Sequence, residues 1–208
     1  AVSEASRQEI IRRYFKTGCE YKKGEVNKSS YDTMSLIMEK SNLKPEDRKV
    51  VVPAREYSEK LKSMIESDEL CTVVALELND GTIITGRSSE LMCASAAAIL
   101  NAVKVLANIP DDMLLISPVI LEPIVKLKTE TLGSRQVSLS LEEVLTALSI
   151  CAVTNPAAQM AMDELSNLEG AQAHSTTMLS KDDEQTFRKL GVDVTCEAVY
   201  PSQNLYYV

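Results

Sequence analysis

The stretch at residues 71–108, CTVVALELNDGTIITGRSSELMCASAAAILNAVKVLAN, decides the fold. β-Branched residues are dense on both sides of Asn79-Asp80-Gly81, which is typical of a tight turn, so these residues predict a β-hairpin. From Leu91 to Ala107 only three residues are polar, and a helix that is apolar on all sides is buried on all sides. A hairpin that leads into a buried helix predicts the core of an α/β domain, but it does not specify a reaction.

The segments after this helix are predicted to alternate between strands and helices. The apolar run Met113–Ile116 indicates a buried strand, and Ser117-Pro118 is a typical start for a helix to about Leu132. Ser140-Leu141-Glu142-Glu143 is a capping box, which predicts the start of another helix. The remaining predicted elements are a helix from Asn155-Pro156 to Gly170, a strand at 172–179, a helix from Ser180 to Gly191 and a strand at 192–199.

The first third of the chain is predicted to form a small helical subdomain. Apolar periodicity indicates helices at 4–23 and 29–41 and from Pro45 onward, with a kink or break at Pro53. Residues 1–70 contain 14 basic and 13 acidic side chains, whereas residues 71–208 contain 8 and 17. This change predicts a helical subdomain at 1–68 and an α/β domain at 69–208. The acidic second part repels phosphate backbones, which argues against nucleic-acid binding.

Composition indicates a protein of the cytoplasm. No run is long and apolar enough to span a bilayer, and no secretory signal opens the sequence. The five cysteines are far apart and form no Cys-x-x-Cys, which predicts reduced and mostly buried thiols. Ala1 is followed at once by a charged helical pattern without an initiator methionine, so we expect a processed form or a piece of a longer protein.

The predicted order of hairpin, buried helix, parallel strand and proline-initiated helix resembles the opening of the cytidine-deaminase-like fold. In that fold the first helix begins with His or Cys, one residue and Glu, and the next begins with Pro-Cys-x-x-Cys, which together bind zinc. The corresponding segments here are Cys93-Ala94-Ser95 and Pro118-Val119-Ile120-Leu121, which keep at most one thiol ligand. Because zinc needs three or four ligands, we expect a three-layer α/β/α sandwich with no metal, no cofactor and no deaminase chemistry.

A candidate anion site is predicted between the hairpin and the buried helix. Backbone amides at a helix start attract anions, and Arg87 would bind a phosphate or carboxylate with Ser88 and Ser89 beside it. The alternative is that one of these serines caps the helix and that Arg87 is solvated. His174, the single histidine, and its neighbour Ser175 are the other candidates. His174 would act as an acid or base, or it would make only structural hydrogen bonds. Because neighbours on a strand face opposite ways, His174 and Ser175 are poor evidence for a joint site. No catalytic residue is assigned.

The whole chain resembles the C-terminal portion of a bacterial group known as uncharacterised protein family 0371. The resemblance depends on four strings, EASRQEIIRRY at 4–14, LGSR at 132–135, AHST at 173–176 and FRKLG at 187–191. Pro53, inside an otherwise helical stretch, departs from what is expected of the family. The resemblance implies a longer protein with an upstream Gly-Ser-Gly-Lys segment similar to a phosphate loop, so that any nucleotide site lies mainly outside this chain. The family has no established activity.

Two functions are consistent with these observations. The first is a non-catalytic accessory or self-association module, which would pack against the N-terminal portion of the full-length protein or form a homo-oligomer without nucleic acid or membrane partners. The alternative is part of a metal-independent enzyme that acts on a small phosphorylated or carboxylated molecule. The alternative requires Arg87, Ser88 and His174 to converge in one pocket.

Overall fold

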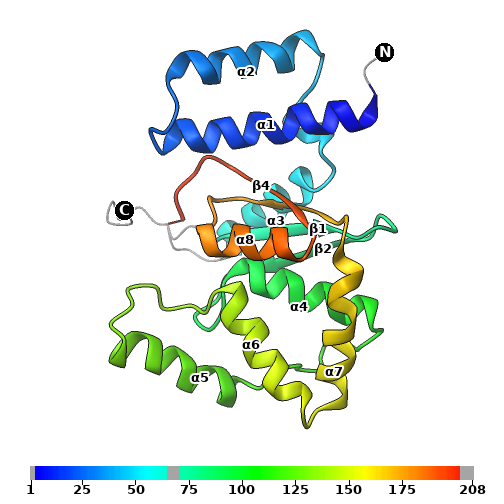
Figure 1. The fold of residues 1–208 in the computed structure, drawn as a ribbon, viewed down its shortest axis with the longest axis vertical. Coiled ribbons are helices and arrows are strands. Elements are labelled where there is room, and N and C mark those ends of the chain that lie inside the picture. Colours follow the sequence, from blue (N-terminus) through cyan, green and yellow to red (C-terminus); the bar gives the residue numbers. More distant parts are fainter. Residues whose placement is uncertain (1–2, 65–70, 202–208) are drawn as a thin grey trace.

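A four-stranded sheet lies at the centre of the computed structural model, which describes residues 3–64 and 71–201 (Figure 1). Its strands run in the order β2-β1-β3-β4. β1 is antiparallel to both of its neighbours, whereas β3 and β4 are parallel. The strands are β1 (Val73–Glu77), β2 (Ile83–Arg87), β3 (Gln172–Ser175) and β4 (Asp193–Cys196). The α/β class predicted from the sequence is therefore confirmed, although the last two strands are shorter than predicted.

The predicted hairpin and buried helix are confirmed. β1 and β2 pair in register from Val73 opposite Arg87 to Glu77 opposite Ile83, and α4 (Ala94–Leu106) packs on one face of the hairpin. Gly86 makes this close approach possible, because a Cβ atom there would lie 2.1 Å from the backbone nitrogen of Ala98. The hairpin and α4 thus belong to the main hydrophobic core, as their composition indicates.

Helices from the first third of the chain cover the opposite face of the sheet (Figure 1). α1 (Glu4–Lys22) contacts β4, and α3 (Val51–Met64) contacts β1, β2 and β3. α2 (Lys28–Lys40) packs on α1, and the short helix η1 (Pro45–Asp47) connects to α3. Pro53 does not break α3, because it lies in the first helical turn, where its missing amide has no partner to lose. The predicted domain boundary at 68/69 lies outside the described residues and stays a prediction.

The predicted strand at Met113–Ile116 is wrong. These residues form an irregular, bent segment, and only Leu115 and Ile116 are buried. β1 already has antiparallel partners on both edges, so no place next to it is open for a parallel strand after α4. The element order that resembled the deaminase-like fold is therefore not found in the part of the chain that the structure describes.

Most of the remaining helices lie beyond α4, on the side away from α1, whereas the last one packs against β4 (Figure 1). Their predicted starts at Pro118, Ser140, Pro156 and Ser180 are confirmed by the capping contacts or the helix bounds. Ser140 and Glu143, for example, form both hydrogen bonds of the capping box, at 3.3 and 2.7 Å. These elements are α5 (Pro118–Lys126) with its π-helical continuation η2 (Leu127–Thr131), α6 (Leu141–Ala152), α7 (Pro156–Asp163) with η3 (Glu164–Leu168), and α8 (Lys181–Lys189). Within the described ranges, no helix has both the length and the apolar character needed to cross a membrane.

Candidate functional site

A buried polar cluster lies where α1 and α3 cover the sheet. His174 on β3 has 0% exposure, and its Nδ1 lies 2.8 Å from the Thr195 hydroxyl on β4. Its Nε2 lies 3.2 Å from Oε1 of Glu197, which follows β4. The same carboxylate oxygen accepts a hydrogen bond from Nε of Arg55 on α3 at 2.7 Å. The ring of Phe15 on α1 covers the imidazole at a centroid distance of 4.7 Å.

Burial sets the protonation states of this cluster. Desolvation lowers the pKa of His174, and this effect outweighs the opposing effect of its hydrogen bond to the Glu197 carboxylate. For Glu197, burial opposes ionisation, but hydrogen bonds from His174 and Arg55 hold the pKa of its carboxyl below the usual value. A neutral imidazole beside a carboxylate donates through Nε2, so Nδ1 accepts from the Thr195 hydroxyl. The cluster therefore contains a neutral histidine and a Glu197–Arg55 ion pair.

This geometry fixes His174 in place and leaves it no free nitrogen for substrate. Both ring nitrogens are hydrogen-bonded, and the ring is enclosed by protein atoms. Two cavities among the described residues, of about 350 and 500 Å³, are lined by other segments, at the α1–α2 end and at the β1–β2 turn. The arrangement suits a structural connection between the helical layer and the sheet better than acid–base catalysis.

The cluster predicts a specific dependence of stability on pH. Because the folded pKa of His174 is lowered, the unfolded chain binds its proton first, and the stabilisation present at neutral pH is lost as pH falls below about 6.5. The pKa of Glu197 is also lowered in the folded state, so the stability that its carboxylate contributes is likewise lost as pH falls, but at more acidic pH. Urea denaturation of His174→Gln is expected to show lower stability at pH 7 and a flatter slope between pH 7 and 5 than the parent chain. Because the sequence has only one histidine, an unchanged slope would contradict this assignment.

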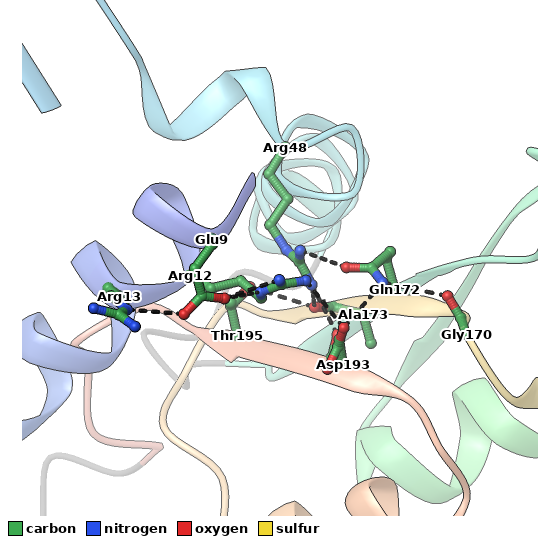
Figure 2. A network of polar contacts seen from close by, with 9 residues as sticks. All are labelled: Glu9, Arg12, Arg13, Arg48, Gly170, Gln172, Ala173, Asp193 and Thr195. Carbon is green, nitrogen blue, oxygen red and sulfur yellow. Dashed lines mark hydrogen bonds and ion pairs between the residues drawn. The ribbon is translucent and has the colours of Figure 1, made fainter. Parts of the chain in front are cut away.

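A second buried network ties η1 and α1 to the edge of the sheet (Figure 2). Arg48 has 1% exposure and donates from Nη2 to the carbonyl oxygens of Asp193 at 2.7 Å and Ala173 at 3.0 Å. Its Nη1 donates to the Gln172 side chain at 2.7 Å. Burial lowers the pKa of Arg48 to about 10, which leaves the guanidinium charged at neutral pH. Arg12 on α1 reaches the Asp193 carboxylate at 3.0 Å, so two arginines hold the start of β4.

The structure separates the residues of the predicted anion site. Arg87 ends β2 and is exposed, and Ser88 lies 3.7 Å from the thiol of Cys71. His174 on β3 is paired with Ala75 on β1, and Ala75 is paired with Thr85 on β2. Arg87 lies two residues beyond Thr85, so it is offset from His174 both across the sheet and along the strands. Two strand spacings of about 4.8 Å separate the backbones of these residues. His174 is also fully buried, whereas Arg87 is exposed. Anion binding at these residues stays a prediction. The structure does not bring Arg87, Ser88 and His174 together in one pocket.

The neighbouring candidates in the sequence do not share a site either. Ser175 is paired with Val74 and His174 with Ala75, so the two side chains point to opposite faces of the sheet. Ser89 hydrogen-bonds Met92 in a turn that precedes α4. Neither Ser88 nor Ser89 caps α4.

Cys93, and not one of the two serines, occupies the N-cap position of α4. Its sulfur accepts from the amide of Ala96 at 3.5 Å and lies 3.4 Å from Oδ2 of Asp183 on α8. Oδ1 of Asp183 accepts from the amide of Leu141, the first residue of α6, at 2.9 Å. A carboxylate therefore lies among the N-terminal ends of three helices, where helix dipoles favour negative charge. Across residues 3–64 and 71–201, no group of three or more His, Cys, Asp or Glu side chains is arranged as a metal site.

The outer face of α5 is the second candidate functional feature. Positions 119, 120, 123 and 127 fall on one side of a helix with 3.6 residues per turn, and all four face solvent. Val119 is 75% exposed, Leu127 52% and Ile120 40%. The inner face of the same helix is also apolar, with Leu121 buried and two further residues packed on the main core. α5 is thus apolar on both sides but covered on only one.

The residues that hold these clusters together carry no signal in the sequence. Arg48, Arg55, Asp183 and Glu197 bind partners that are distant in sequence, so no local spacing indicates them. The signal for the outer face of α5 is present in the sequence, because Glu122 and Lys126 are the only charged residues in Pro118–Leu127.

Comparisons with known proteins identify related sequences of unknown function. The family model described as "Domain of unknown function DUF1846, C-terminal" matches residues 46–206, and the one described as "Domain of unknown function DUF1846, N-terminal" matches residues 1–42. A UPF0371 protein of Clostridioides difficile strain 630 is 69% identical over 206 residues, which are 99% of this chain and 41% of the relative. UPF0371 proteins of Clostridium botulinum strain Langeland and Clostridium tetani strain Massachusetts are 67% and 63% identical, with the same coverage. The chain spans 41% of the length of these curated relatives, and the resemblance to uncharacterised protein family 0371 is confirmed.

Proposed function

Because the chain belongs to the family described as "Domain of unknown function DUF1846, C-terminal", whose curated relatives here are more than twice its length, we propose that it is a non-catalytic assembly module of a longer protein. Its task is to bury the outer face of α5, defined here as Val119, Ile120, Pro123 and Leu127, against another protein surface. Any nucleotide site of the longer protein is then located outside this chain, in keeping with the resemblance to the family.

The observation that carries the proposal is the apolar character of α5 on both of its sides. Soluble helices normally have a polar outer face, and a helix that is apolar all round is normally covered all round. α5 contributes only Leu121 to the fully buried core, whereas its three largest outer side chains expose between 40% and 75% of their surface. Exposed apolar residues also precede and follow it, at Leu114 and Leu132. Clustered exposure of this kind is typical of interaction surfaces.

The alternative function, a metal-independent enzyme part, has less support. It needs Arg87, Ser88 and His174 in one cavity, and these residues lie on different parts of the sheet. The finer fold assignment, a deaminase-like sandwich, likewise has no support from the strand order. The assembly proposal depends on neither of them.

Hydrogen–deuterium exchange tests the proposal. In the longer Clostridioides difficile relative, amides of the segment that aligns with residues 118–131 are expected to exchange at least about tenfold more slowly than in this chain at high dilution. The segment that aligns with α2 serves as the control, since α2 also has an exposed apolar pair, Leu36 and Ile37, and lies at the opposite end of the molecule (Figure 1). Equal exchange of the α5 segment in both proteins would contradict the proposal.

A further inference from the structure

We infer that the partner of the outer α5 face is a second copy of this chain, bound antiparallel about a two-fold axis close to Pro123. This inference rests on the proposed function and specifies its partner. It depends on two properties of α5 that a two-fold interface requires. The first is an apolar stripe that is similar at its two ends, and the second is a pair of opposite charges beside that stripe.

The apolar stripe is close to symmetric about Pro123. Val119 and Ile120 lie one helical turn before the proline, and Leu127 lies one turn after it. In an antiparallel pair centred there, the valine and isoleucine of one copy meet the leucine of the other, and the two prolines face each other across the axis. Each apolar side chain then has an apolar counterpart.

The charges that flank the stripe are self-complementary. Glu122 and Lys126 lie on the same side of the stripe, one turn apart and on either side of the axis. A two-fold axis perpendicular to two antiparallel helices brings equivalent sides together, so Glu122 of each copy lies beside the partner's Lys126. Among the described residues Glu122 makes no ion pair, and Lys126 makes only a long surface contact with Glu130 at 3.8 Å. Both side chains are therefore available for a partner.

A parallel arrangement or an unrelated partner has no such match. In a parallel pair equivalent flanks lie at opposite edges of the contact, so Glu122 and Lys126 of one copy do not reach Lys126 and Glu122 of the other, and no ion pair forms between them. The antiparallel pair instead forms two ion pairs at the edge of an apolar contact, which is the usual anatomy of a protein interface.

Charge reversal in the intact chain tests this inference by light scattering over a concentration series. The parent chain is expected to reach twice the monomer mass of 22.9 kDa. Glu122→Lys alone and Lys126→Glu alone each place like charges together twice per dimer and are expected to weaken association by about tenfold. The double change Glu122→Lys with Lys126→Glu restores both pairs and is expected to restore dimerisation. Circular dichroism checks that each variant is folded, as expected for changes at exposed positions.

Apolar variants provide the matched control. Ile120→Asp is expected to abolish the dimer, whereas Ile37→Asp on α2, a residue with the same 40% exposure, is expected to leave it intact. A monomer at all concentrations, or a double charge reversal that fails to restore association, would overturn the second copy as the partner. The assembly function itself fails only if the α5 segment is also unprotected in the longer relative, so the two failures are distinguishable.

Discussion

Replacing Arg48 with methionine is expected to lower the free energy of unfolding by about 3–5 kcal/mol. Methionine retains much of the apolar stem but donates no hydrogen bond, so the carbonyl oxygens of Ala173 and Asp193 lose their charged donor in a buried setting. The carbonyl oxygen of the Gln172 side chain loses its hydrogen-bond donor at the same time. Urea denaturation followed by circular dichroism measures the loss.

Arg13→Met provides the matched control for this experiment. Arg13 also pairs with a carboxylate, that of Glu9 at 2.8 Å, but its side chain is 69% exposed. Exposed ion pairs contribute about 0–1 kcal/mol, so this variant is expected to be nearly as stable as the parent chain. If both variants lost the same stability, Arg48 would not be the residue that fastens η1 to the sheet.

The contrast between these arginines shows what the sequence could predict. Hairpin turns, capping boxes and proline-initiated helices depend on residues within four positions of each other, and those at Asn79–Gly81, Ser140 and Pro156 are all found where predicted. The acceptors of Arg48 lie 124 to 145 residues away in the chain. A single sequence contains no pattern that relates residues at such distances. The role of Arg48 is therefore visible only in the folded structure, where the strands bring its acceptors together.

The wrong strand at Met113–Ile116 has a related cause. A run of four apolar residues fits a buried strand and a buried loop equally well, and the choice depends on whether a sheet edge is open beside it. Here β3, almost 60 residues further on, occupies the edge of β1 that a parallel strand would need. His174 illustrates the same limit, because the sequence identified the residue but not Thr195 and Glu197, which determine what it does.

Replacing Asp183 with alanine is expected to lower the free energy of unfolding by about 2–4 kcal/mol. The carboxylate has 3% residue exposure and accepts hydrogen bonds from the Leu141 amide and the Cys93 thiol, so its removal leaves donors unpaired at the starts of α6 and α4. Asp182→Ala is the control, because Asp182 lies in the same first turn of α8 but is exposed. Its loss removes only a favourable interaction with the helix dipole, worth about 0.3–1 kcal/mol.

The reactivity of Cys93 gives this prediction a second, independent readout. Burial and the neighbouring charge of Asp183 raise the pKa of Cys93 to about 12, which keeps the thiol protonated and unreactive. Asp183→Asn preserves the shape of the side chain but removes its charge, so the pKa of Cys93 is expected to fall and its alkylation by iodoacetamide to accelerate at fixed pH. Asp182→Asn is expected to leave the alkylation rate unchanged, because no contact joins Asp182 to this thiol. Equal alkylation rates in both variants would show that burial alone protects Cys93 and that the Asp183 carboxylate does not act on the start of α4.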